Sequence, residues 1–151
     1  PTRSNAENLS RPAWLYTQSA VVPLRRDPAT GEWRICLITS RKGTRWVIPK
    51  GVVDPGQTPL TSAEREAWEE AGLRGRILAP PLGQYQYRKW KGVCTVTVYA
   101  MLVDQALDDW PEAETRTREW LTIDEALPRI AEPDLRALIH IALERIDDHP
   151  G

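Results

Sequence analysis

The sequence contains few or no residues of several types, and it lacks long apolar runs. It has no phenylalanine, one methionine and only two cysteines in 151 residues. Cys36 and Cys94 each lie in an apolar run, so we expect two buried free thiols rather than a disulfide. No apolar run approaches the roughly 18 residues needed to span a bilayer, and no signal-peptide pattern opens the chain. We therefore expect a cytoplasmic protein without a membrane partner.

Net charge is also nearly absent, at −1 for the whole chain. A chain without a strong charge of one sign gives no indication of general nucleic-acid or membrane binding. Arginine supplies 16 of the 20 basic residues, and its planar guanidinium pairs well with phosphate oxygens. The length fits a single domain, which we expect at residues 12–148 behind a flexible leader at residues 1–11.

Apolar and β-branched segments separated by turn residues predict a series of strands. In the last of them, apolar residues alternate with threonine and tyrosine, which is typical of a half-buried strand. An acidic loop is expected at residues 104–117. Thr122 and Glu125 then form a capping-box pair that opens a short helix. The expected strands lie at residues 14–24, 33–39, 46–48, 76–88 and 92–103.

Two longer helices complete the pattern. Thr58 can cap a helix over residues 58–71, Pro59 suits its first turn, and Gly72 ends it. A second helix begins near Pro133. Strands on both sides of one helix, followed by a closing helix, predict an α/β fold with a mixed sheet between helices. The predicted buried faces are Leu60, Ala63, Ala67 and Ala71 in the first helix, and Leu135, Leu138, Ile139, Ala142 and Ile146 in the second.

The first helix carries the most informative residues. Glu66, Glu69 and Glu70 stand at i, i+3 and i+4, so their carboxylates share one helix face, where like charges repel. A solvated helix face is the simpler interpretation. A hard divalent cation such as Mg²⁺ would instead use these oxygens as ligands and remove the conflict. Arg65 lies four residues before Glu69 and could hold that carboxylate in place. Gly51, in a turn just before the helix, favours a site because it lets the backbone approach closely.

The segment from residue 51 to residue 73 resembles the Nudix signature. That signature is Gly, five residues, Glu, seven residues, then Arg-Glu-aliphatic-any-Glu-Glu-any-Gly-aliphatic. The chain supplies Gly51, then Gln57, then Arg65-Glu66-Ala67-Trp68-Glu69-Glu70-Ala71-Gly72-Leu73, with every spacing kept. Gln57 departs from the pattern, because it keeps a hydrogen-bonding oxygen but loses the charge. We expect this departure to change tuning more than activity.

The resemblance implies an α/β/α sandwich and a magnesium-dependent hydrolase that cleaves a pyrophosphate linkage. It makes Glu66 and Glu70 the leading metal ligands, with Glu69 third, the Gly51 carbonyl as a further ligand, and Mn²⁺ as a substitute metal. Arg65 belongs to the same catalytic set. The general base would be one of these glutamates or a loop carboxylate, for which Glu112 and Glu114 are candidates; a solvated loop carboxylate is the simpler interpretation of both.

Weaker similarity extends over roughly residues 15–145. Residues 46–51 resemble the diphosphoinositol polyphosphate phosphohydrolase and diadenosine polyphosphate hydrolase group. Residues 107–112, 118–121 and 124–126 are similar to the diphosphoinositol branch. This similarity implies a phosphate-rich small molecule as substrate, bound by a monomer or homodimer. Each candidate phosphate ligand could equally be a solvated surface residue. The candidates are Ser40, Arg41, Lys50, Arg88, Lys89 and Lys91.

Alternatives to this substrate class remain open. A nucleotide-sanitising pyrophosphatase of the 8-oxo-dGTP type would need a purine pocket, for which Trp14, Tyr87 or Trp90 could stack. An ADP-ribose or NADH pyrophosphatase is less favoured, because the downstream motif of the NADH type is missing. A catalytically impaired Nudix module that only binds a ligand is the alternative outside enzymes, and Gln57 is the one feature that favours it.

Overall fold

Strand β1 (Thr17–Arg26) lies at the centre of a seven-stranded mixed sheet. The structure, a computed structural model, describes residues 11–147. β1 pairs in parallel with β6 (Gly92–Ala106) along one edge, and its other edge pairs antiparallel with β4 (Lys50–Val52) and β2 (Trp33–Thr39). Outside these strands, β5 (Leu73–Lys89) pairs with β6, while β3 (Trp46–Val47) and β7 (Arg118–Thr122) pair with β2.

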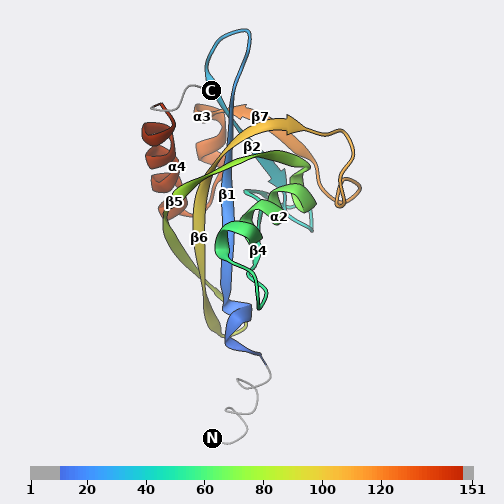
Figure 1. Cartoon of the computed structure of the whole chain (residues 1–151), viewed down its shortest axis with the longest axis vertical. Coiled ribbons are helices and arrows are strands. Elements are labelled where there is room, and N and C mark those ends of the chain that lie inside the picture. Colours follow the sequence, from blue (N-terminus) through green and yellow to red (C-terminus); the bar gives the residue numbers. More distant parts are fainter. Residues whose placement is uncertain (1–10, 148–151) are drawn as a thin grey trace, which may run out of the picture.

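Helices cover both faces of this sheet, as Figure 1 shows. Helix α2 (Pro59–Ala71) lies on one face, where its alanines pack against Val21 of β1. Helix α4 (Pro133–Ile146) packs on the opposite face with the short α3 (Ile123–Ala126) and η2 (Leu127–Arg129), against Ala20, Val22 and Leu24 of β1. Because successive side chains of a strand point to opposite faces, β1 contributes to both cores. The expected α/β/α sandwich with a mixed sheet is confirmed.

The predicted ends of the helices agree closely with the structure. The hydroxyl of Thr58 caps α2, and Gly72 ends it with the left-handed φ of 65° that glycine adopts readily. Thr122 and Glu125 form the expected capping box at α3. The five residues predicted to face the core from the last helix are all buried.

The strand predictions need three corrections. Residues 13–16 form a 3₁₀ turn, η1 (Ala13–Tyr16), so the first strand begins at Thr17 rather than at Trp14. Strand β6 continues to Ala106, into the segment expected to be loop. Strands β4 and β7 were not predicted, because each is short and is defined by the strand beside it rather than by its own pattern. Residues 1–10 of the expected leader lie outside the described residues.

Both cysteines are buried and unpaired, as expected. Among residues 11–147, no helix has the length and apolar character needed to cross a membrane.

Candidate active site

The site is built where α2 passes the short strand β4. The small side chains of Ala63, Ala67 and Ala71 are fully buried, which lets the helix axis lie close to the sheet. The next residues around the helix, Glu66 and Glu70, are therefore brought against β4 and are each only 8% exposed. Their burial shows that these glutamates do not form the solvated face that was the simpler interpretation of the sequence.

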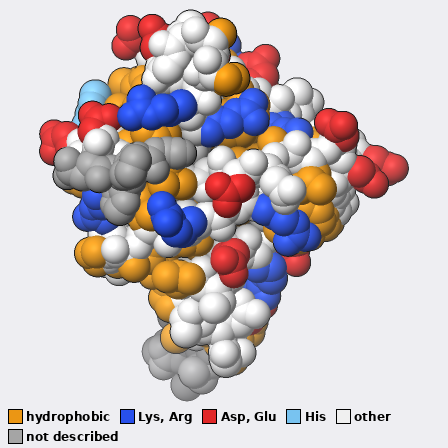
Figure 2. Space-filling view, turned by 45° about the horizontal axis from the view of Figure 1, so that its top comes forward, with side chains coloured by type: hydrophobic (Ala, Val, Ile, Leu, Met, Phe, Trp, Pro, Cys, Tyr) orange, Lys and Arg blue, Asp and Glu red, His pale blue; other side chains and the backbone are white. Residues whose placement is uncertain are grey.

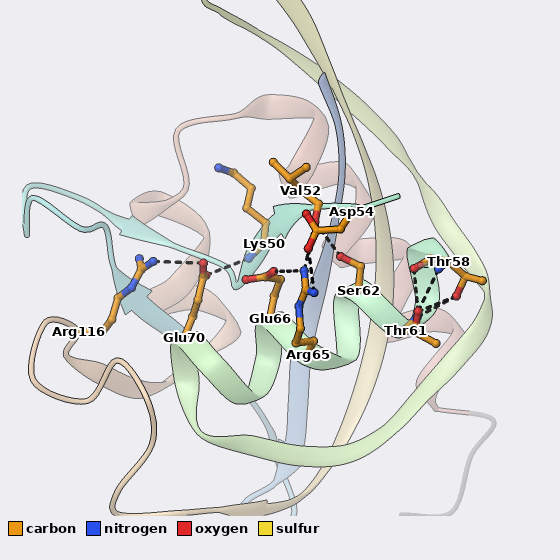
Figure 3. A network of polar contacts seen from close by, with 10 residues as sticks. All are labelled: Lys50, Val52, Asp54, Thr58, Thr61, Ser62, Arg65, Glu66, Glu70 and Arg116. Carbon is orange, nitrogen blue, oxygen red and sulfur yellow. Dashed lines mark hydrogen bonds and ion pairs between the residues drawn. The ribbon is translucent and has the colours of Figure 1, made fainter. Parts of the chain in front are cut away.

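Gly51 is in direct contact with the carboxylate of Glu66. A Cβ atom at position 51 would lie 2.3 Å from Cδ of Glu66 and 2.4 Å from Oε2, so any other residue would displace this carboxylate. On the same strand, the backbone N–H of Lys50 donates to Oε1 of Glu70 at 3.1 Å. Figure 3 shows both carboxylates directed from α2 toward strand β4, which contains Lys50 and Val52. The glycine of the motif is thus required by a close approach.

Arg116 bridges two acidic side chains and was not found from the sequence. Its Nη2 lies 3.2 Å from Oε2 of Glu70 and its Nε lies 3.0 Å from Oε1 of Glu112. Nη1 donates to the carbonyl of Thr39 at 3.0 Å, and Arg116 as a whole is 8% exposed. Each of the three guanidinium nitrogens of Arg116 has an oxygen partner, and water has little access to the side chain. Arg116 therefore holds the Glu70 carboxylate firmly from the side opposite the Lys50 N–H.

The structure corrects the expected partner of Arg65. Its Nη1 lies 3.0 Å from Oδ2 of Asp54, and its Nη2 lies 3.3 Å from Oε2 of Glu66, so it does not pair with Glu69. Asp54 in the loop before the helix supplies the negative charge for Arg65, whereas Gln57 is exposed. The effect of Gln57 on activity stays a prediction.

Burial raises the pKa of Glu70 to about 7, and this increase outweighs the opposing effect of Arg116. Burial also raises the pKa of Glu66, although Arg65 lowers it in part. A buried carboxylate near other carboxylates is stabilised in its charged form by added positive charge. The carboxylates of this helix face therefore favour the binding of a cation.

The raised pKa of Glu70 predicts a pH-dependent stability of the metal-free protein. The folded-state pKa of about 7 exceeds the ordinary value of 4.5, so protonation of Glu70 stabilises the folded state. This contribution to the free energy of unfolding is fully present below pH 4.5 and is lost as pH rises through 7. We expect the free energy of unfolding of the wild type, relative to Glu70→Gln, to fall by about 2 kcal/mol between pH 5 and pH 8. Urea unfolding in a chelator measures this difference. Parallel pH profiles for the two proteins would contradict it.

A cleft of about 530 Å³ opens above these carboxylates. It collects most of the residues predicted from the sequence, but it also contains residues that the sequence did not indicate. The predicted residues that line it are Ser40, Arg41, Lys50, Gly51, Arg65, Glu66, Glu69, Glu70, Lys89 and Glu112. The additional polar residues are Gln18, Arg45, Asp54 and Arg116.

Arg88, Lys91 and Glu114 were candidates from the sequence but do not line this cleft. Successive side chains of a strand point to opposite faces of the sheet, so Lys89 points toward the cleft and Arg88 points to the other face. Lys91 lies in the two-residue turn between β5 and β6, and Glu114 is exposed. Of the predicted basic cluster on this hairpin, only Lys89 reaches the site.

Four basic side chains of the cleft form no ion pair with another residue in the described range. Lys50 is more than half buried with its Nζ 4.9 Å from the centre of the Tyr87 ring, and burial lowers its pKa. Tyr87 in turn donates from its hydroxyl to Oε1 of Gln18 at 2.9 Å. Arg65 and Arg116, in contrast, are neutralised by carboxylates. The four are Arg41, Arg45, Lys50 and Lys89.

On the face that Figure 2 shows, basic and acidic side chains are interspersed, with hydrophobic side chains between them. This mixing agrees with the net charge of −1.

The donor set fits a divalent cation such as Mg²⁺ in its chemistry. Glu66, Glu69 and Glu70 offer carboxylate oxygens, which hard cations prefer, and the close contact at Gly51 brings a backbone carbonyl into the same region. Within residues 11–147, no three acidic, histidine or cysteine side chains already converge as a metal cage. In their present positions Arg65 and Arg116 satisfy the charge of Glu66 and Glu70, respectively.

Comparisons with known proteins agree with this geometry. "Nudix hydrolase 16, mitochondrial" of Arabidopsis thaliana is 40% identical over 108 residues, which cover 66% of this chain and 59% of that protein. "Diphosphoinositol polyphosphate phosphohydrolase 3-beta" of Homo sapiens is 34% identical over 93 residues, covering 59% of this chain and 54% of the relative. The chain thus spans between half and three-fifths of the length of these two relatives.

Solved structures show the same fold. The Ap4A hydrolase of C. elegans superposes with a TM-score of 0.71 at 20% identity, covering 86% of this chain and 97% of that one. The Nudix hydrolase RenU of M. smegmatis superposes with a TM-score of 0.67 at 19% identity, covering 91% and 89% of the two chains. The family model described as NUDIX domain matches residues 15–140. With the signature, the fold and this match in agreement, the chain belongs to the Nudix family.

Proposed function

We propose that the protein hydrolyses a diphosphate linkage in a phosphate-rich small molecule, such as a diphosphoinositol polyphosphate or a dinucleoside polyphosphate. The observation that carries the proposal is the cleft, which brings the carboxylates of α2 together with four basic side chains that form no ion pair within the described residues. Carboxylates alone would repel phosphate, whereas the basic side chains attract it. A ligand that satisfies both sets of charges is a chain of phosphates accompanied by a divalent cation.

Mg²⁺, or Mn²⁺ in its place, would be held by Glu66 and Glu70, with Glu69 and the Gly51 carbonyl as further ligands. When bound, it would neutralise phosphate oxygens and lower the pKa of a coordinated water. Glu69 is the one carboxylate of the three without an ion pair to another described residue. When Glu66 and Glu70 hold the metal, we assign to Glu69 the role of accepting a proton from the attacking water. Glu112 is less suited to that role because it already accepts a hydrogen bond from Arg116.

The basic residues would orient the phosphate chain. Lys50 and Lys89 both line the cleft, and burial and, to a smaller extent, the positive charge of Lys89 lower the pKa of Lys50, so the two ammonium groups lie close enough to act together on one phosphate chain. The names of the human relative and the C. elegans neighbour include diphosphoinositol polyphosphate and Ap4A, respectively.

The sanitising alternative has less support. A purine pocket needs aromatic walls, but no aromatic side chain lines the cleft within residues 11–147. Trp14 and Trp90 are exposed outside the lining, and Tyr87 contacts Lys50 and Gln18 instead. A cytoplasmic location stays a prediction, and the name of the Arabidopsis relative includes the word mitochondrial.

Product release with and without Mg²⁺ tests the function on a panel of substrates. The panel contains a diphosphoinositol polyphosphate, a dinucleoside polyphosphate, ADP-ribose, NADH and 8-oxo-dGTP. We expect Mg²⁺-dependent turnover of the first two. Turnover of 8-oxo-dGTP alone would overturn the substrate class, and no turnover of any member would favour the ligand-binding module.

Lys89 should determine how strongly long phosphate chains bind. We expect Lys89→Met to raise KM for the longer substrate by roughly tenfold, which corresponds to about 1.4 kcal/mol of lost charge-assisted contact. Arg88→Met is the matched control, because Arg88 is the neighbouring cation on the same strand but lies outside the cleft lining. Steady-state kinetics with substrates of two chain lengths measure both effects. An equal change in the two variants would show that the hairpin contributes only general surface charge.

A further inference from the structure

The segment of residues 107–118, called the capping segment below, covers the C-terminal end of α2. The last carbonyls of a helix have no partner within the helix and are commonly left to water. Here four successive carbonyls each accept a hydrogen bond from the capping segment. Glu69 O accepts from Glu112 N at 3.0 Å, Glu70 O from Trp110 Nε1 at 3.0 Å, Ala71 O from Arg118 Nη1 at 2.7 Å, and Gly72 O from Leu107 N at 3.0 Å.

Trp110 is the side chain most closely fitted to this helix end. A Cβ atom at Gly72 would lie 2.9 Å from Cβ, Cδ2 and Cε3 of Trp110, so the side chain packs directly on the glycine. The guanidinium of Arg118 lies 4.4 Å from the centre of its indole ring. Trp110 is therefore fixed by its hydrogen bond to Glu70 O, by the contact at Gly72 and by the contact with Arg118.

The carbonyls capped in this way belong to residues whose side chains form the site. Glu69 and Glu70 are in the last turn of α2, so a shift of that turn moves both carboxylates relative to Gly51 and Lys50. The capping segment also carries Glu112 and Arg116 into the cleft. Trp110 itself does not line the cleft.

We propose that Trp110 is a positioning residue that holds the last turn of α2, and with it Glu69 and Glu70, in register with strand β4 at Gly51. This inference rests on the proposed catalytic role of these glutamates. The loss of one donor to Glu70 O leaves a partly buried carbonyl unsatisfied, and the turn can then move toward water. A displacement of about 1 Å at a catalytic group can lower a rate by as much as 100-fold.

Trp110→Phe tests the proposal because it keeps an aromatic ring but removes the indole N–H. We expect kcat at saturating Mg²⁺ and substrate to fall by on the order of tenfold, with KM changed less than about twofold. Trp68→Phe is the matched control. Trp68 lies on the same helix and its ring also contacts an arginine, Arg74 at 4.1 Å, but its indole donates no hydrogen bond within the described residues. Thermal unfolding of both variants shows whether a loss of fold accounts for lower activity.

A second measurement does not depend on turnover. In ¹H–¹⁵N spectra of the metal-free protein, the indole N–H of Trp110 should exchange with water much more slowly than that of exposed Trp14, and Trp110→Phe should speed exchange of the Leu107 and Glu112 amides. Equal indole exchange rates, or equal kinetic losses in the Trp110 and Trp68 variants, would overturn the proposal. The two proposals can also be told apart. If the Trp110 indole is protected and the Leu107 and Glu112 amides lose protection in Trp110→Phe, Trp110 holds the last turn of α2. If no substrate of the panel is turned over at the same time, the proposed function fails while this positioning role is kept.

Discussion

Glu70→Gln should lower Mg²⁺-dependent turnover by on the order of 100-fold or more, a larger loss than the roughly 10–100-fold seen when only an outer partner of a metal ligand is removed. Glutamine keeps the shape of the side chain and an oxygen that can accept from Lys50 N, so the fold should persist. What it removes is the anionic oxygen that a hard cation prefers. Initial rates over a range of Mg²⁺ concentrations, together with a thermal melt, measure the effect.

Glu64→Gln is the matched control for this experiment. Glu64 lies on the same helix and carries the same charge, but it is exposed and outside the cleft lining. Its substitution should change turnover by less than about twofold. Near-wild-type turnover of Glu70→Gln at saturating Mg²⁺ would be incompatible with the assigned site.

Arg116→Met should be the most destabilising single substitution at the site in the absence of metal. It removes the partner of Glu70 and Glu112 from a position that is 8% exposed, and one buried charge without its partner is destabilising by about 3 kcal/mol or more. It also removes the donor to Thr39 O, which ties β2 to the capping segment. Urea unfolding at pH 7.5 in a chelator measures the loss.

Arg129→Met provides the comparison, because Arg129 pairs with Glu119 at 2.8 Å in a largely exposed position. A surface ion pair contributes at most about 1 kcal/mol, so we expect a small effect. Mg²⁺ that binds the folded state stabilises every variant in which the site is intact, so the difference between Arg129→Met and the wild type should stay unchanged when Mg²⁺ is added. The difference between Arg116→Met and the wild type should decrease, since Mg²⁺ supplies positive charge near Glu70. Equal losses in the two variants would show that the bridge to Glu70 contributes little.

Glu70 could be identified as a site residue from the sequence, whereas Arg116 could not. The proposed role of Glu70 follows from its spacing with Glu66, which places both carboxylates on one helix face whatever the rest of the fold. Arg116 gave no comparable signal, because it lies 46 residues after Glu70 in a loop of mixed charge. Asp54 was also missed, since the helical spacing made Glu69 the obvious partner for Arg65.

Features that depend on neighbours a few residues away could be predicted from local sequence patterns. These are the ends of α2 at Thr58 and Gly72, the capping box at Thr122, and the buried face of α4, all of which follow from backbone hydrogen bonds and helical periodicity. The pairing of charges, in contrast, depends on how the elements pack. Alternation along β5 turned Lys89 toward the cleft and Arg88 away, and the docking of residues 107–118 placed Arg116 beside Glu70. Such contacts join residues far apart in the chain, so their geometry is set by the packing of the sheet and helices and not by local sequence.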